Sequence, residues 1–275
     1  MTVSAASLQI RALEEYLRLP LFRRNGRQVS LTDEGAALLP RVERALAELE
    51  RAIDDSRAER GSGGVRVTTL VSFLQQWLLP RLPRFYAGHP SVDLHLHTST
   101  QLVDFVRDEC DAAIRYGLGR YAGLDAEKLF DEWLVPVCTP ALFAKLGRVH
   151  DADDLRRYRL LHSTTEPWSA WLLRCCSDEL DPLNAGGSHF DDSFAIVRSA
   201  LAGHGLALAR WSLAASEIAS GSLVAASPEA VKVDRSYWFV SPARARMSEA
   251  VRRFREWVRA EAQQFPGPPG AAGGG

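Results

Sequence analysis

From residue 65 to residue 262 the sequence alternates between short runs with strand character and longer runs with helical character. The strand-like runs are rich in β-branched residues, and the helical runs repeat apolar residues every three or four positions. We expect strands at 65–71, 92–98, 111–116, 132–138, 159–162, 205–209, 222–226 and 236–240. We expect helices near 73–87, 101–109, 140–146, 167–175, 192–203, 211–220 and 244–263. Such alternation favours an α/β fold with mainly parallel strands, and a stretch of about 200 residues predicts two lobes.

A glycine-rich break, Gly61-Ser62-Gly63-Gly64, separates this region from a helical start rich in arginine and glutamate. Such a run lacks side-chain anchoring and is typical of a linker. The end of the chain is rich in proline and glycine, which predicts a disordered tail. The expected division is a helix and hairpin unit at 1–32, a linker helix at 33–60, a hinge at 61–64, a two-lobed domain at 65–262 and a tail at 263–275.

The first 30 residues combine a helix with a basic hairpin. Ile10, Leu13 and Leu17 recur at helical spacing, and Asn25-Gly26 is the sequence most typical of a two-residue hairpin turn. Residues 1–30 carry a net charge of +3, whereas the next 30 residues carry −3. A helix that begins with small hydroxyl and amide side chains, followed by an arginine-rich hairpin, suits a helix in the major groove of DNA and a wing on its phosphates. The alternative interpretation is a helix and hairpin whose charges are simply solvated.

The next segment predicts a long helix with a narrow apolar stripe. Thr32 is a good N-cap for a helix from about Asp33 to Glu59. The apolar residues of the stripe step by three and four, and they are Leu39, Val42, Leu46, Leu49 and Ile53. This stripe favours pairing with a second copy of the chain, and packing on its own chain is the alternative. Pro40 inside the helix is expected to kink it and to separate the first turn.

Hydroxyl side chains stand at three predicted strand ends, directly before helices. They are Ser72, Thr98-Ser99-Thr100 and Ser163-Thr164-Thr165. Open α/β sheets bind ligands at the carboxyl ends of their strands, where helix amides attract anions, so the three together indicate a small polar or anionic ligand. Taken singly, each is also a typical helix N-cap. Arg115-Tyr116 at another strand end would add a cation and a stacking surface, although a salt bridge from Arg115 to Asp111 or Asp125 is an equally ordinary use.

Composition and missing motifs exclude several classes of protein. Hydrophobic residues make up 46% and charged residues 24%, which are proportions of a globular protein. No stretch resembles a membrane span or a signal peptide, so we expect a cytoplasmic protein with no membrane partner. The four cysteines have no C-x-x-C spacing, and His95 and His97 lack further clustered ligands, so no metal site is expected. No phosphate-binding loop or catalytic motif is present, so we expect neither an enzyme nor a cofactor.

Several motifs carry a resemblance to one family. The N-terminal ones are Ser4-Ala5-Ala6-Ser7-Leu8-Gln9-Ile10-Arg11-Ala12-Leu13-Glu14-Glu15-Tyr16-Leu17, Pro20-Leu21-Phe22-Arg23-Arg24 and Leu31-Thr32-Asp33-Glu34-Gly35. In this order they resemble the LysR-type bacterial transcriptional regulators. The effector domain of that family is resembled by Leu134-Val135-Pro136-Val137-Cys138-Thr139-Pro140 and Gly203-x-Gly205-Leu206-Ala207. Three further motifs are most similar to the subgroup that includes the glycine-cleavage-operon activator, namely Arg115-Tyr116-Gly117, Phe190-Asp191-Asp192-Ser193 and Ala207-Leu208-Ala209-Arg210.

The resemblance implies a winged helix-turn-helix, a long linker helix that pairs two subunits, and a two-lobed effector domain like periplasmic binding proteins. It implies a regulator that binds double-stranded promoter or operator DNA and a small-molecule effector, such as an amino acid or organic acid, and that forms a homodimer or homotetramer. By position, the DNA-binding residues would be Ser4, Ser7, Gln9, Arg24, Asn25 and Arg27. The effector-binding residues around the cleft would be Ser72, Thr98, Ser99, Thr100, Arg115 and Ser163.

The chain departs from the family pattern near its start. Family members carry about 30 further residues before the recognition helix, so the resemblance here predicts a partial winged helix-turn-helix. One explanation is a start codon assigned too far downstream. The other is a truncated, non-DNA-binding effector receptor that oligomerises with full-length relatives. Arg18 stands where the family usually has glycine, and a left-handed arginine there costs on the order of 1 kcal/mol.

Overall fold

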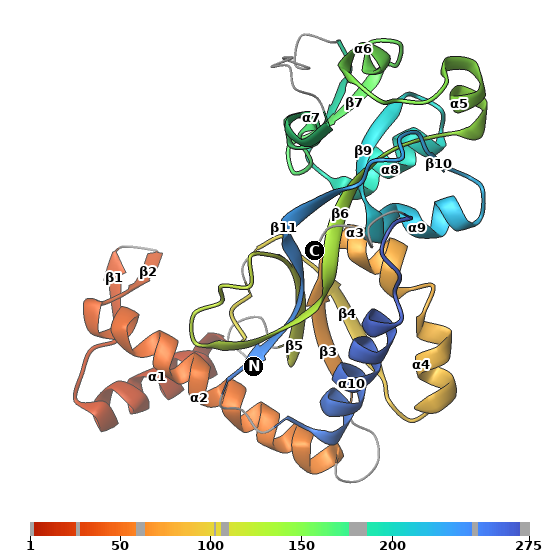
Figure 1. Cartoon of the computed structure of the whole chain (residues 1–275). Coiled ribbons are helices and arrows are strands. Elements are labelled where there is room, and N and C mark those ends of the chain that lie inside the picture. Colours follow the sequence, from red (N-terminus) through yellow and green to blue (C-terminus); the bar gives the residue numbers. More distant parts are fainter. Residues whose placement is uncertain are drawn as a thin grey trace.

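The computed structural model describes residues 3–25, 28–58, 64–101, 103–105, 110–175, 186–243 and 247–269. Within that part of the chain, no helix combines the length and the hydrophobicity that crossing a lipid bilayer requires. The chain forms an N-terminal unit, a long helix and a body of two lobes (Figure 1).

The N-terminal unit is a helix followed by a hairpin of two antiparallel strands. Its elements are α1 (Val3–Leu17), β1 (Phe22–Asn25) and β2 (Gln28–Leu31). Arg18, directly after α1, has a φ of 54°, which is the left-handed conformation expected at this position. The carboxylate of Glu14 fixes the connection to the hairpin, because its Oε1 accepts hydrogen bonds from Leu21 N at 2.7 Å and from Phe22 N at 2.9 Å.

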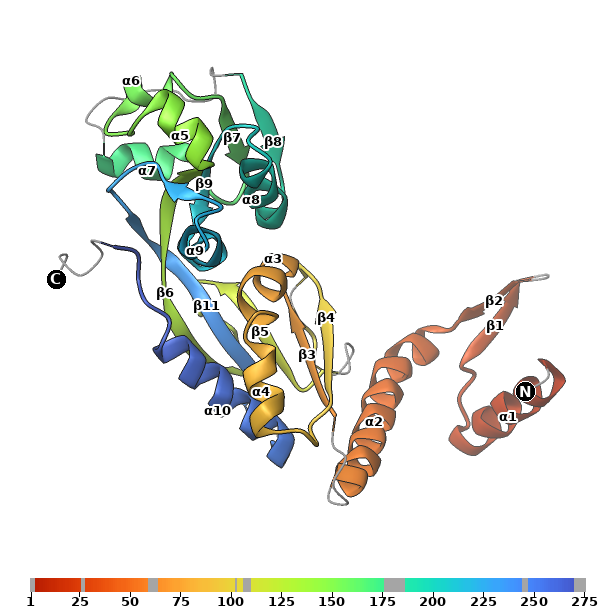
Figure 2. The same cartoon turned by 90° about the vertical axis from the view of Figure 1, so that its right-hand side faces the viewer.

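The long helix α2 (Asp33–Ala58) leads from the hairpin toward the body (Figure 2). Thr32 caps it as predicted, because its Oγ1 accepts a hydrogen bond from Gly35 N at 3.0 Å and donates one to Pro20 O at 2.7 Å. The expected separation of the first turn at Pro40 is wrong, since α2 continues through this residue. A single missing backbone hydrogen bond is tolerated where helix propagates cooperatively on both sides.

The body is built on one sheet that passes through both lobes. Among the described residues its order is β4-β3-β5-β11-β6-β9-β7-β8, and β10 pairs with β6 off this path. The strands are β3 (Val65–Thr69), β4 (Leu94–Thr98), β5 (Ala112–Gly117), β6 (Leu124–Cys138), β7 (Leu160–Ser163), β8 (Ser188–Phe190), β9 (Leu206–Arg210), β10 (Val224–Ala225) and β11 (Val231–Pro242).

The sheet is parallel at both ends and antiparallel in the middle. β3 pairs parallel with β4 and β5, and β7 pairs parallel with β8 and β9. The central strands β6 and β11 pair antiparallel with each other and with β9 and β5, respectively. The expectation of a mainly parallel sheet is therefore wrong in the centre, because two long strands run in opposite directions between the lobes.

These two long strands connect lobe I with lobe II (Figure 1). Lobe I contains β3, β4 and β5 with α3 (Val71–Phe73), the π-helical turn η1 (Leu74–Leu78), α4 (Leu82–Gly88) and α10 (Glu249–Gln263). Lobe II contains β7 to β10 with α5 (Pro140–Leu146), α6 (Ala152–Leu155), α7 (Trp168–Cys175), α8 (Ser193–Leu201) and α9 (Trp211–Ala219). Each lobe buries its own apolar core, around Phe73 and Trp77 in lobe I and around Trp171 and Ile196 in lobe II. The lobes meet where α9 packs against η1.

Most predicted elements coincide with observed ones, and the exceptions have physical reasons. The helix expected at 73–87 is divided into α3, η1 and α4, because Pro80 interrupts it and Pro83 lies in the first turn of α4. The short elements β8 and α6 were not predicted. Residues 103–105 of the helix expected at 101–109 are not helical, and 102 and 106–109 lie outside the described residues.

The chain stays in contact with the body after α10. Phe265 packs against cores of both lobes, and Pro266 O accepts a hydrogen bond from Trp211 Nε1 at 2.7 Å. Pro268 is buried. The expectation of a disordered tail from residue 263 does not match Gln263, which ends α10, or the contacts of Phe265 and Pro266 with the body. The last six residues lie outside the described part.

Candidate functional site

A buried ion pair lies where the two lobes meet. Arg210 is the last residue of β9, and Glu166 follows the end of β7 by three residues, so both come from lobe II. Arg210 Nε lies 2.9 Å from Glu166 Oε1, and the two side chains are only 3% and 1% exposed. Charges removed from water to this extent are costly unless additional hydrogen bonds satisfy them.

Three hydroxyl groups provide such hydrogen bonds to Glu166. Ser163 Oγ donates to Glu166 Oε2 at 2.6 Å, and Thr165 Oγ1 donates to the same oxygen at 2.7 Å. Ser193 Oγ lies 3.0 Å and 3.1 Å from the two carboxylate oxygens and accepts a hydrogen bond from Arg210 Nη2. All three hydroxyls come from the end of β7 or the start of α8. One end of lobe II therefore surrounds a carboxylate with donors.

Two tyrosines of lobe I contact the same guanidinium group. Arg210 Nη1 donates a hydrogen bond to Tyr237 Oη at 2.6 Å, and Arg210 Cζ lies 4.2 Å from the ring centroid of Tyr116. Tyr116 belongs to β5, and Tyr237 lies in the part of β11 that pairs with β5 and packs in the core of lobe I. A desolvated cation over an aromatic face contributes about 2 kcal/mol. Arg210 thus joins the lobes, and we use the term interlobe cluster for Tyr116, Ser163, Thr165, Glu166, Ser193, Arg210 and Tyr237.

Burial and neighbouring charges decide the ionisation of this cluster. Burial by itself lowers the pKa of Arg210, but the nearby Tyr237, Glu166 and Tyr116 raise it by more, so its pKa lies above its ordinary value. Burial raises the pKa of both Tyr116 and Tyr237 well above the usual range, although Arg210 opposes this shift. The arginine therefore stays charged at neutral pH, and both tyrosines stay neutral.

A second buried carboxylate, Glu132, lies close to the cluster. It belongs to β6 and is fully buried, and its Oε1 accepts hydrogen bonds from Ser212 N and Trp133 N, each at 3.1 Å. Ser212 Oγ donates to its other oxygen. Burial raises the pKa of Glu132 to about 7, while the hydrogen bonds from Ser212 and the charge of Arg210 oppose the shift. This group therefore titrates near neutral pH.

One of the six residues predicted around the cleft, Ser163, lies in the interlobe cluster. Ser72 is buried in α3 of lobe I, and the buried hydroxyl of the nearby Thr69 has no hydrogen-bond partner among the described residues. Thr98 and Thr100 are exposed and Ser99 is half-buried, all three at the end of the outermost strand β4. The ends of β3 and β4 are neighbours, because Ser99 N donates a hydrogen bond to Thr69 O at 3.0 Å and Thr98 pairs with Thr69.

Arg115 points away from the interlobe cluster. It precedes Tyr116 on β5, so its side chain lies on the opposite face of the strand, where Nη2 donates to Thr68 Oγ1 at 2.9 Å. The sequence predicts Arg115 as a cation around the cleft, but the cation of the interlobe cluster is Arg210.

Sequence reasoning assigned no role to Glu166, Ser193, Arg210 or Tyr237. A signal existed for two of them, because Ser193 and Arg210 end two of the motifs that resemble the glycine-cleavage-operon activator subgroup. An arginine at the end of the apolar run Leu206–Arg210 is also unusual, since buried arginines need partners. Glu166 offered no comparable signal, because its partners are separated from it by up to 44 residues.

The predicted DNA-binding residues lie in the N-terminal unit. Gln9 is exposed on α1, Ser4 and Ser7 belong to the same helix, and Arg24 and Asn25 belong to β1. The side chains of Ser4, Ser7, Arg24 and Asn25 lie outside the described residues, as does all of Arg27.

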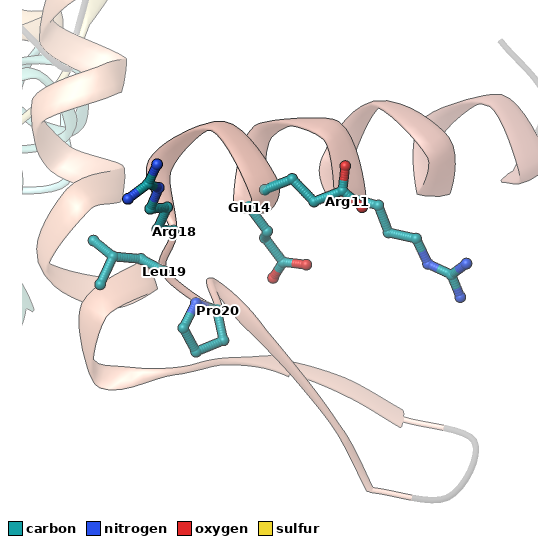
Figure 3. A pocket seen from close by; sticks show the side chains of 6 residues that line it. Arg11, Glu14, Arg18, Leu19 and Pro20 are labelled. Atoms are coloured by element: carbon teal, nitrogen blue, oxygen red, sulfur yellow. The ribbon is translucent and has the colours of Figure 1, made fainter.

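A hollow of about 310 Å³ lies beside the end of α1 (Figure 3). It is lined by Arg11, Glu14, Glu15, Arg18, Leu19 and Pro20. The carboxylate of Glu14 in this hollow is already used by the backbone of the hairpin, so its role is to hold the hairpin on α1.

Two family models match the chain. The model of the bacterial regulatory helix-turn-helix protein, lysR family, matches residues 1–36. The model of the LysR substrate binding domain matches residues 58–263, which is most of the chain.

Relatives and solved structures of the same kind are similar to the chain. The glycine cleavage system transcriptional activator of Escherichia coli (strain K12) is 31% identical over 263 residues, which are 95% of this chain and 86% of the relative. The HTH-type transcriptional activator AmpR of Providencia stuartii is 33% identical over 268 residues, which are 96% and 88% of the two chains. The effector domain of the transcriptional regulator AmpR of Pseudomonas aeruginosa matches with a TM-score of 0.63 and 32% identity, covering 73% of this chain and 95% of that domain. These relatives are named as regulators or activators, not as enzymes.

A fourth similarity concerns the fold alone. The full-length structure of the Vibrio cholerae virulence activator AphB matches with a TM-score of 0.59 at 21% identity, and covers 94% of this chain and 90% of that one. The order of N-terminal unit, long helix and two-lobed body is therefore an arrangement already seen in a solved full-length structure.

Proposed function

We propose, from the premise that the chain belongs to the LysR family of bacterial transcriptional regulators, that it binds promoter DNA through its N-terminal unit and a small-molecule effector between its lobes. As a member of this family it is a transcriptional regulator and not an enzyme. The observation that carries the proposal is the cluster in which a buried arginine of lobe II contacts two tyrosines of lobe I. A ligand that altered this contact would change how the lobes meet, and through α2 the placement of the DNA-binding unit.

The exposure of Gln9 on α1 supports the DNA-binding part of the proposal. We assign Ser4, Ser7 and Gln9 to base edges in the major groove, and Arg24, Asn25 and Arg27 to phosphates. A fluorescence-anisotropy titration of DNA from upstream of the gene tests this at several salt concentrations. Each phosphate contact contributes about −0.9 to the slope of log affinity against log salt, and a salt-independent affinity would contradict the proposal.

Variants distinguish the residues assigned to phosphates from those assigned to base edges. Replacing Arg24 and Arg27 by alanine weakens binding to all sequences alike, whereas Gln9→Ala changes which sequence is preferred. Arg156→Ala is the matched control, because it removes an exposed positive charge on lobe II, far along the chain from the N-terminal unit. A wing variant that shifts sequence preference, together with a helix variant that does not, would contradict the assignment.

The effector part of the proposal places an amino acid or organic acid in the cleft, near Ser72, Thr98, Ser99, Thr100 and Ser163. Arg115 joins this group only if it leaves Thr68, because its side chain lies on the other face of β5. A thermal-shift screen of amino acids and small organic acids tests the assignment. A ligand at 100 times its dissociation constant adds about 2.7 kcal/mol to the free energy of unfolding, and the absence of any stabilising compound would count against it.

We further propose a homodimer or homotetramer that acts in the cytoplasm, where bacterial promoters are. Leu39, Val42 and Leu46 on α2 are 43%, 39% and 55% exposed, and a second α2 would cover this stripe. Light scattering of the wild type and of Leu46→Glu measures the effect. We expect a dimer or tetramer for the wild type and a smaller species for the variant, whereas a monomeric wild type would contradict the proposal.

A further inference from the structure

We propose that the carboxylate of Glu166 occupies, from within the chain, the place at Arg210 that an effector carboxylate takes, and that the effector is a zwitterion with both a carboxylate and an ammonium group. This inference rests on the proposed function and names the ligand class of the same interlobe site.

The end of lobe II has the donors of a carboxylate-binding site. Glu166 receives hydrogen bonds from the hydroxyls of Ser163, Thr165 and Ser193, and Arg210 Nε lies 2.9 Å from it. Three hydroxyl donors and one guanidinium cation are the kind of partners that a buried carboxylate requires. These groups recognise a carboxylate wherever it comes from, so a ligand carboxylate and the Glu166 side chain compete for them.

The net charge of the buried cluster decides which kind of ligand carboxylate can replace Glu166 at Arg210. The cluster contains one cation, Arg210, and one carboxylate, Glu166, and both tyrosines are neutral. The buried Glu132 beside it titrates near neutral pH and adds further negative charge. A simple carboxylic acid entering in its ionised form would leave one buried negative charge uncompensated, which is expensive. A zwitterion adds no net charge, because its carboxylate pairs with Arg210 while its ammonium group pairs with the displaced Glu166.

Displacement of Glu166 by a ligand carboxylate also affects lobe I, because Arg210 contacts residues of both lobes. Arg210 Nη1 is held 2.6 Å from Tyr237 Oη, and its Cζ lies 4.2 Å from the Tyr116 ring centroid. A guanidinium that turns toward a ligand carboxylate changes both contacts. Binding on lobe II therefore alters the contact between the lobes, which is what the regulator needs from its effector.

The first experiment measures binding of matched probes to the full chain without DNA. The twenty standard amino acids are screened by thermal shift, and each one that binds is compared by calorimetry with its deaminated acid and its decarboxylated amine, such as L-alanine with propionate and ethylamine. We expect the amino acid to bind at least about thirtyfold more tightly than either partial probe, since each partial probe leaves one buried charge unpaired. Equal or tighter binding of a deaminated acid, or no binding of any amino acid, would overturn the zwitterion assignment.

The second experiment empties the internal site. Glu166→Ala removes the competing carboxylate and leaves Arg210 and the three hydroxyls in place, so acetate or propionate should bind to this variant and raise its melting temperature, with no such effect on the wild type. Glu166→Gln is the conservative companion, which keeps the side chain in place and should lose affinity for the amino acid. Glu249→Ala removes an exposed carboxylate of lobe I and is the matched control.

The outcomes of this second experiment are distinct. If acetate and propionate affect wild type and Glu166→Ala equally, Glu166 is not an internal competitor. If Glu166→Ala does not fold, an unchanged affinity of Glu166→Gln for the amino acid would overturn the inference in the same way. Both measurements are made without DNA, so a failure here is distinguishable from a failure of DNA binding.

Discussion

The two lobes contribute different chemistry to the place where they meet. Lobe II supplies both buried charges, Arg210 and Glu166, together with the hydroxyls that solvate them. Lobe I supplies only the ring of Tyr116 and the hydroxyl of Tyr237. Within the interlobe cluster, both ionised groups therefore belong to lobe II, and the contacts from lobe I are made by neutral tyrosines.

The ion pair does not depend on a contact with lobe I, because Arg210, Glu166 and the hydroxyl donors all belong to lobe II. The contacts to Tyr116 and Tyr237 are individually modest, on the order of 1–2 kcal/mol each. A ligand with a differential affinity of a few kcal/mol can therefore change the junction.

The largest expected effect concerns the charges of lobe II. Arg210→Met leaves Glu166 buried without its cation, and we expect the free energy of unfolding to fall by about 3–5 kcal/mol. The double variant Arg210→Met/Glu166→Gln has a neutral cluster and should recover most of this loss. Urea unfolding followed by circular dichroism measures both. If Arg210→Met loses less than about 1 kcal/mol, the claim that lobe II holds a mutually dependent buried charge pair is contradicted.

The second prediction concerns the pH dependence of stability, which tests the buried carboxylate Glu132. Glu132 has a pKa raised from 4.5 to about 7 by burial, so its contribution to stability is complete below pH 4.5 and is lost as the pH rises through 7. We expect this fall to be on the order of 2–3 kcal/mol and Glu132→Gln to abolish it. Urea unfolding at pH 5 and pH 8 measures the difference. A wild-type fall that persists in Glu132→Gln would assign it to another group, and Glu249→Ala should retain it.

The third prediction tests how lobe I senses the arginine. Tyr237→Phe removes the hydroxyl that accepts a hydrogen bond from Arg210 Nη1, and we expect a loss of about 1.5–2 kcal/mol. Tyr116 contacts Arg210 through its ring face, so Tyr116→Phe keeps the contact and should lose less than about 0.5 kcal/mol. Thermal and urea unfolding of both variants give the comparison. Equal losses would contradict the claim that Arg210 contacts the hydroxyl of Tyr237 but the ring of Tyr116.

The last prediction concerns the outer surface of lobe I, where we expect a much smaller effect than for Arg210→Met. Glu249 lies in exposed ion pairs with Arg252 and Arg253 on α10. Because solvent screens such pairs, Glu249→Ala should change the free energy of unfolding by at most about 1 kcal/mol. A loss comparable to that of Arg210→Met would remove the distinction between buried and exposed charge pairs on which the comparison rests.

The order of elements could be predicted from the sequence because periodicity and local signals report it directly. Thr32 as an N-cap and Asn25-Gly26 between two hairpin strands are signals that act through their immediate neighbours in the chain. The antiparallel centre of the sheet could not be predicted in this way, because the pairing of β6 with β11 joins residues about 100 positions apart.

The site could be predicted only in part for the same reason. The rule that hydroxyls at strand ends face the ligand located Ser163, which lies in the cluster. Arg115 ends a strand as well, but alternation along β5 turns its side chain to the opposite face from Tyr116 and away from the cluster. Arg210 and Glu166 are brought together only by the packing of β7, β9 and α8, which no local pattern reveals.

The most direct test of the account is an anisotropy titration of the full chain on DNA from upstream of its gene, with and without the amino acid that stabilises the protein most. The account predicts a salt-dependent affinity that the amino acid changes about fivefold or more in the wild type, and no such change in Arg210→Met/Glu166→Gln. A salt-independent affinity, or an amino-acid effect that persists in the double variant, would contradict the claim that Arg210 couples the effector to DNA.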